Sequence, residues 1–151
     1  EEYVATQHVH HRMADPETQK LLQRFRIVRS EVDLSKPRTT GHSSFWYSLH
    51  LVFVNDGRFG ETDVEVLERI GETIARAAEE RGHLLSRAAV LADHMHLTLG
   101  CSPPEAPCDV ALCYMNNLAF ACGMRAIFRF SAYVGTFGEY NIWVPSLRES
   151  L

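Results

Sequence analysis

The stretch Val90-Leu91-Ala92-Asp93-His94-Met95-His96-Leu97-Thr98-Leu99 is an apolar run that favours a β-strand and carries two histidines one residue apart. Residues i and i+2 of a strand point to the same face, so His94 and His96 project together, with their backbones about 7 Å apart. Met95 and Leu97 then point the other way, into a core. Neutral imidazole ligates divalent metals near pH 7. The pair therefore predicts half of a metal site, open to solvent; the alternative is a strand with two polar residues on its wet face.

The order Asp93-His94-Met95-His96-Leu97 resembles the histidine-hydrophobe-histidine (HUH) strand of the single-tyrosine transposases, including the REP-associated tyrosine transposases. Residues 45–54 resemble the first strand of that family, which carries a histidine before an apolar run. Residues 131–138 resemble its aromatic-Val-x-Thr-x-Gly strand, which precedes the catalytic helix. The three landmarks occur in the family's order.

The resemblance implies metal-dependent nicking and rejoining of single-stranded DNA through a tyrosine-phosphodiester intermediate, as in transposition. It implies a divalent metal ion, Mg or Mn, held by His94, His96 and a third ligand, for which Glu149 is the candidate. The family takes its tyrosine from a helix after the Thr-x-Gly strand, yet residues 147–149 hold no tyrosine here. Tyr140 is the nearest candidate nucleophile, and an aromatic residue at a strand-to-helix junction is the alternative interpretation. A diverged enzyme, a shortened chain and a scaffold that binds DNA without cutting it all remain open.

The same resemblance implies single-stranded DNA, which could form a hairpin, and a second copy of the chain as partners. Candidate DNA contacts are Arg24, Arg29, Arg38 and Asn117. The net charge of −4 gives no general basic footprint, so any phosphate-binding patch must be local.

Two further residues near the landmarks have open or structural interpretations. His50 is expected either to support the metal site from the neighbouring strand or only to pack. Tyr133 lies inside a predicted strand, and we interpret it as structural.

Length and composition place bounds on the whole chain. A chain of 151 residues with 46% hydrophobic and 23% charged residues is typical of one globular domain with a real core. No apolar run has the roughly 18 residues of a membrane helix, and the polar N-terminus is unlike a signal peptide. We expect a cytoplasmic protein with reduced thiols, because the four cysteines fit no zinc or redox spacing.

The periodicities predict an α+β fold of the ferredoxin-like, split βαβ type, an antiparallel sheet with helices packed on one face. Residues 1–41 are expected to form an extension with a basic amphipathic helix that begins at Asp15-Pro16, followed by a linker, and residues 42–151 the transposase-like domain. Asn55-Asp56-Gly57 ends the first strand. The first domain helix is predicted to follow a cap at Thr62 or Asp63 and to end at Gly82. The second is predicted from Val110 to Cys122 after a cap at Asp109, because the prolines at 103, 104 and 107 disfavour regular structure.

Two other functions use the same residues. His96-Leu97-Thr98 has the His-x-Thr form of metal-independent two-histidine phosphoesterases, with His42-Ser43-Ser44 as a weak partner motif in a loop. A non-catalytic nucleic-acid-binding or dimerisation domain is the other alternative, in which Trp46, Phe130 and Trp143 would stack bases.

Overall fold

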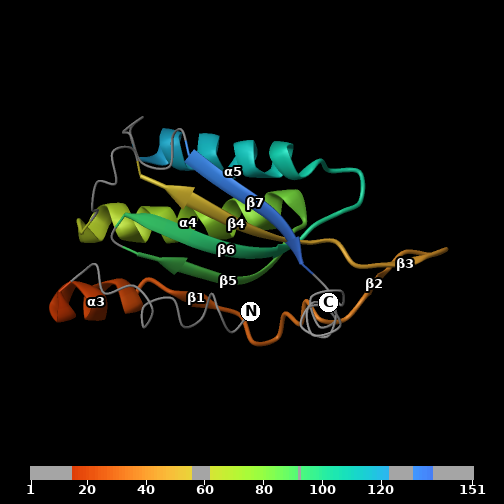
Figure 1. The fold of residues 1–151 in the computed structure, drawn as a ribbon, viewed down its shortest axis with the longest axis horizontal. Helices are drawn as coiled ribbons and strands as arrows, with labels where there is room; N and C mark the ends of the chain where they lie inside the picture. The colour runs from red at the N-terminus through yellow and green to blue at the C-terminus, as the bar shows by residue number, and fades with distance from the viewer. Residues whose placement is uncertain (1–14, 56–61, 92, 123–130, 138–151) are drawn as a thin grey trace, which may run out of the picture.

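The computed structural model describes residues 15–55, 62–91, 93–122 and 131–137 (Figure 1). Within these ranges, five strands form one sheet in the order β1-β5-β6-β4-β7, and every neighbouring pair is antiparallel. Two longer helices, α4 and α5, lie side by side behind this sheet in Figure 1, and the shorter α3 contacts β5. A two-stranded hairpin, β2-β3, stands beyond one end of the sheet. The elements are α3 (Pro16–Gln23), β1 (Ile27–Val28), β2 (Arg38–Thr39), β3 (Ser44–Phe45), β4 (Ser48–Val54), α4 (Val64–Arg81), β5 (Leu84–Val90), β6 (His94–Gly100), α5 (Pro107–Ala121) and β7 (Ser131–Phe137).

The predicted fold class is confirmed. The units β4-α4-β5 and β6-α5-β7 are interleaved, so that β6 lies between β5 and β4, and β4 lies between β6 and β7. This arrangement is the split βαβ plan. No helix in the described ranges is both long and apolar enough to cross a membrane.

Alternation along the two central strands separates a helix-covered face from an opposite face. Leu49, Leu51 and Phe53 of β4 are fully buried. So are Met95, Leu97 and Leu99 of β6 and Leu67, Ile70 and Ile74 of α4. Burial of each such side chain contributes about 1.5–3 kcal/mol. The intervening residues of both strands point to the face that α4 and α5 leave uncovered, which we call the histidine face; its central members are His50, Val52, Val54, His94, His96 and Thr98.

The predicted helix ends are largely confirmed. The Asp15 carboxylate accepts hydrogen bonds from the backbone N–H groups of Glu17 and Thr18 at the start of α3. Asp63 caps α4 in the same way, and Gly82 ends it with a left-handed φ of 66°. The position of Asp109 is different: α5 begins at Pro107 after Ala106. Proline is well suited to the first turn of a helix, where its missing N–H has no intrahelical partner, so Pro107 starts the helix.

The strand limits also differ from the predicted ones. The histidine strand begins at His94, whereas Val90 ends β5, and the Leu91 N–H donates to the His94 carbonyl in the connecting turn. The run from 90 to 99 therefore contains a hairpin corner, for which Asp93 is the one typical turn residue. The predicted first strand is likewise divided between β3 and β4, and part of the predicted linker forms β2.

Residues 15–41 pack against the sheet. Ile27 and Val28 pair with Ala88 and Arg87, which adds a strand to the β5 edge. Leu34 is almost fully buried. The domain limits at residues 41 and 42 stay a prediction.

Candidate metal and nucleic-acid site

The two histidines of β6 share the histidine face, as their spacing predicts. Their ring centroids lie 5.1 Å apart, with an angle of 69° between the ring planes. The side chains are buried, however, since His94 is 5% and His96 4% exposed. Ala89 and Val52 lie directly opposite His96 on the two neighbouring strands, which leaves little of the ring open. The expectation of an open face is therefore wrong for the rings themselves.

Each histidine has its Nδ1 atom engaged by a neighbour. His94 Nδ1 donates to the Asp93 carboxylate, with 2.6 Å between Nδ1 and Oδ1. His96 Nδ1 lies 2.9 Å from Nε2 of His50. Metal-binding histidines in proteins typically use one ring nitrogen for the metal and hold the other by a carboxylate, carbonyl or similar acceptor. Asp93 and His50 are placed to fill that role, which makes Nε2 the nitrogen that each ring could offer to a metal.

His50 of β4 fits the role of acceptor. Its burial lowers the pKa of its imidazole below the usual 6.5, which keeps the ring neutral at pH 7. A neutral ring has one bare nitrogen, and this nitrogen can accept the His96 proton. The two rings also stack, at 5.2 Å between centroids and 23° between planes. His50 was expected either to support the metal site or only to pack. Its direct contact with His96 favours the first interpretation.

The donor set of this site fits half of a metal shell. Two imidazoles suit Mn²⁺ moderately and Zn²⁺ better, and either ion needs further oxygen or nitrogen donors. In the described ranges, no three His, Cys, Asp or Glu side chains are grouped so as to hold a metal. Glu149, the candidate third ligand, and Tyr140, the candidate nucleophile, lie outside the described residues.

Tyr133 of β7 lies on the histidine face. Val52 pairs with Tyr133 on one side and with His96 on the other, so all three side chains point the same way. The Tyr133 ring stands edge-on to His50, 6.3 Å away, and the residue is 60% exposed. Tyr133 does lie inside a strand, and its structural role stays a prediction; its exposure is what the sequence does not indicate.

Arg87 of β5 is a cation on this face that sequence reasoning missed. A bulge at Ser86 shifts the β5-β6 register between Leu85 and Arg87, so Arg87 pairs with Thr98. Without the extra residue, Arg87 would oppose Leu97 and point to the helices. Bulges commonly re-aim side chains near functional sites. The sequence does carry one sign of this role, because Arg87 is the only charged residue of the strand Leu84–Val90.

Arg87 and Thr98 share an unusual feature. Within the described ranges, the buried Nε of Arg87 and Oγ1 of Thr98 have no hydrogen-bond partner. Both groups can donate, and leaving a buried donor unsatisfied costs about 1–3 kcal/mol. His50 lies directly opposite Thr98 on the other side, so the three residues form one row across the sheet.

The four predicted DNA contacts are scattered. Arg24 is exposed at the end of α3, and the Arg29 N–H donates to the carbonyl of Ser86, the residue before Arg87 in β5. Arg38 donates to the Cys101 carbonyl, and its guanidinium lies over Phe45. Asn117 is on α5, across the sheet from the histidine face, and donates to the Cys113 carbonyl. The structure brings none of the four onto the row of Arg87, Thr98 and His50.

The partner motif of the two-histidine phosphoesterases is also apart from His96. His42 is exposed in the turn between β2 and β3, and Ser44 begins β3. These two strands form a separate sheet that does not pair with β6. Trp46 is exposed beyond β3, whereas Phe130 and Trp143 lie outside the described residues.

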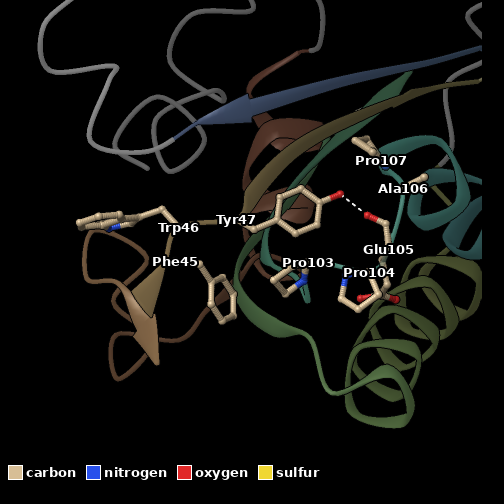
Figure 2. Close-up of a pocket in the computed structure, with 8 residues that line it drawn as sticks. All are labelled: Phe45, Trp46, Tyr47, Pro103, Pro104, Glu105, Ala106 and Pro107. Atoms are coloured by element: carbon tan, nitrogen blue, oxygen red, sulfur yellow. Dashed lines mark hydrogen bonds between the residues drawn. The ribbon is translucent and has the colours of Figure 1, made fainter. Parts of the chain in front are cut away.

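A pocket of about 580 Å³ lies at the other end of β4, between the β3 segment and the start of α5 (Figure 2). Its walls are aromatic and proline side chains, chiefly Phe45, Trp46, Pro103 and Pro104. The Tyr47 hydroxyl donates to the Glu105 carbonyl across it. Ser48, next to the pocket, pairs with Gly100, whereas Val54 at the opposite end of β4 pairs with His94, so the pocket is distinct from the β6 histidines.

A buried polar cluster lies behind that pocket. His83 Nδ1 is 3.0 Å from the Tyr114 hydroxyl, and His83 Nε2 is 3.0 Å from a Glu105 carboxylate oxygen. Tyr114 is fully buried. The cluster ties the end of α4 to α5 and to the loop before it, which indicates a structural role.

The comparisons with known proteins support the fold. No protein-family model matches the sequence, and no curated protein matches it. A solved structure of a candidate transposase from Deinococcus radiodurans R1 superposes with a TM-score of 0.54 and 19% identity, over 75% of this chain and 97% of that one. A REP-associated tyrosine transposase, solved bound to a REP hairpin, gives a TM-score of 0.53 and 12% identity, over 71% of this chain and 68% of that one. The chain therefore has the fold seen in these transposase structures, in agreement with the family that its histidine strand resembles.

Proposed function

We propose that this protein is a transposase-like enzyme that nicks and rejoins single-stranded DNA through a tyrosine-phosphodiester intermediate. One observation carries the proposal: His94 and His96 share a strand face, and each has its Nδ1 held, by Asp93 and by His50. This arrangement prepares two Nε2 atoms for one divalent ion. It stands on a fold that two transposase structures share.

In this proposal, His94, His96 and Glu149 hold Mg²⁺ or Mn²⁺. The bound ion would polarise the scissile phosphate and neutralise the charge that develops on it. Because both histidines are buried, the side chains around them have to move aside for a phosphodiester to approach. The partly exposed Arg87, which neighbours this pair from β5, is the side chain best placed to do so.

The covalent step belongs to a tyrosine, for which Tyr140 is our candidate. Its hydroxyl oxygen forms a bond to phosphorus, and the bond from phosphorus to the 3′ oxygen breaks. The tyrosine loses its proton and the departing 3′ oxygen gains one. The 5′ phosphate stays on the enzyme, so the reverse reaction rejoins the strand without another energy source.

Arg87 is the cation that we add to this site. Its guanidinium and the Thr98 hydroxyl are donors on the histidine face, and a phosphate oxygen would satisfy both. In this proposal Arg24 and Arg29 extend the contact to the neighbouring DNA backbone, whereas Arg38 and Asn117 would serve DNA elsewhere on the surface. We propose a homodimer, as the resemblance implies.

The test is incubation with single-stranded oligonucleotides and Mn²⁺, followed by denaturing electrophoresis. We expect a covalent protein–DNA adduct that Tyr140→Phe abolishes while DNA binding persists. A binding domain without catalysis is the second candidate, and the burial of the histidines favours it. DNA binding without an adduct, for any sequence, would establish that candidate instead.

A further inference from the structure

An exposed aromatic ring ends a continuous row of rings on the histidine face. The row runs from His94 through His96 and His50 to Tyr133, with consecutive centroids 5.1, 5.2 and 6.3 Å apart. It crosses three strands, β6, β4 and β7. The three histidines are buried or half-buried, but Tyr133 is 60% exposed. A large apolar ring is thus presented to solvent one side chain away from the pair that we assign to phosphodiester chemistry.

Gly135 fixes where this ring lies. A Cβ atom at position 135 would lie 2.5 Å from the Tyr133 hydroxyl oxygen and 3.0 Å from its Cζ. The ring therefore leans along β7 and rests directly over the glycine. Gly135 pairs with His50, which places the tip of Tyr133 beside that histidine. The absence of a side chain at 135 gives the ring a defined seat before any ligand arrives.

We propose that Tyr133 is a stacking platform for one nucleobase of single-stranded DNA, next to the phosphodiester held at His94 and His96. This inference rests on the proposed function. Single-stranded nucleic acids bind aromatic side chains through the π-faces that every base carries. Tyrosine is suited to this because its ring is large and loses little conformational entropy on binding.

Other exposed aromatic residues in the described ranges lack this setting. Phe120 is 81% exposed, but it is on α5, across the sheet from the histidine pair. Trp46 is 43% exposed, and its Nε1 donates to the Ser35 carbonyl near the β2-β3 hairpin. Tyr133 combines exposure with direct contact to the histidine row, and Phe120 supplies a matched control.

The first experiment measures binding of a fluorescent single-stranded oligonucleotide by anisotropy, without divalent metal so that no cleavage intervenes. Tyr133→Leu should weaken binding about tenfold, in the range that base stacking contributes. Tyr133→Phe, which keeps the ring, should bind as the wild type does. Phe120→Leu, which removes a still more exposed ring from the opposite side, should also leave affinity unchanged.

The second experiment removes the base and leaves the protein intact. An abasic nucleotide moved along the oligonucleotide should weaken wild-type binding about tenfold at one position. Tyr133→Leu should show no further loss at that position. Gly135→Ala should weaken binding too, because its Cβ displaces the ring, and should have no added effect together with Tyr133→Leu.

The outcomes separate this inference from the proposed chemistry. Wild-type affinity in Tyr133→Leu, or no sensitive position in the abasic series, would overturn the platform; the abasic series needs only wild-type protein, so it decides even if a variant fails to fold. Loss of adduct formation in Tyr133→Phe, with unchanged binding in Tyr133→Leu, would assign the hydroxyl to the reaction and also overturn it. Ring-dependent binding without any adduct would support the platform and refute nicking.

Discussion

His50 Nε2 lies 2.9 Å from His96 Nδ1 across the β4-β6 pair. This contact joins β4 to β6. In the sequence, β4 is only an apolar run with one histidine, whereas β6 carries the metal-binding pattern. A ring that holds a metal-ligating histidine fixes its tautomer and orientation, and loss of such a partner typically lowers metal affinity 10–100-fold. His50 is therefore the residue that tests whether the histidine pair is organised for a metal.

We expect His50→Ala to weaken Mn²⁺ binding by about 10-fold or more without loss of the fold. His50→Asn, whose side-chain oxygen can accept the His96 proton, should recover part of the affinity. Isothermal titration with Mn²⁺ measures both. Equal affinities in all three proteins would show that His50 only packs.

Arg87→Gln should reduce the salt dependence of single-stranded DNA binding. Each phosphate contact to a single strand contributes about 0.7 to the slope of log affinity against log salt, so the slope should fall by roughly that amount. Arg76, exposed on the α4 helix behind the sheet, provides the control, since Arg76→Gln makes the same charge change away from the histidine face. The same decrease in both variants would indicate only a general charge effect.

Tyr114→Phe should destabilise the protein by about 1–3 kcal/mol, because it leaves a buried nitrogen of His83 without its hydroxyl partner. Tyr133→Phe removes a hydroxyl from an exposed residue and should change stability by less than about 0.5 kcal/mol. Urea unfolding followed by circular dichroism compares the two. Equal midpoints would mean that the His83–Tyr114 contact contributes nothing net.

Cysteine labelling should divide the thiols by burial. All four cysteines are free; burial and, next, the nearby Glu105 carboxylate raise the pKa of the Cys101 thiol to about 12. The thiolate is the reactive form, so Cys101 stays protonated and inert at pH 8, and its reactivity should rise only as the pH approaches that value. Cys108 is exposed and should react first with iodoacetamide. Mass spectrometry locates the label, and early modification of Cys101 would contradict the buried position of its thiol.

Much of the fold could be predicted because local patterns and tertiary packing agree. In α4, the apolar residues Leu67, Ile70 and Ile74 recur at helical spacing, and all three are buried against the sheet. The Asp63 cap and the Gly82 terminus mark the same helix in the sequence and in the structure. The break between β5 and β6 was not predicted, because its only typical turn residue, Asp93, stands within a β-favouring run without Gly or Pro. The start of α5 was predicted too late because Pro107 was interpreted as a helix breaker. Proline breaks a helix in its interior but is favoured in its first turn, where Pro107 lies.

The candidate site was predictable only within one strand. The spacing of His94 and His96 places them on a common face whatever surrounds them. Their burial, and the positions of Arg87 and Tyr133, depend on pairing with other strands and on the bulge at Ser86. Register of this kind is a long-range property that no short motif encodes.

A Mn²⁺ titration of the full chain, followed by calorimetry and by electron paramagnetic resonance, tests directly whether His94 and His96 bind a metal ion. We expect one bound ion, nitrogen coupling from imidazole, and loss of the ion in both His94→Ala and His96→Ala. His83→Ala, which removes a buried histidine elsewhere, should retain it if the variant stays folded. Binding that is unchanged in the two β6 variants, or no binding by the wild type, would contradict the assignment of this histidine pair as a metal site.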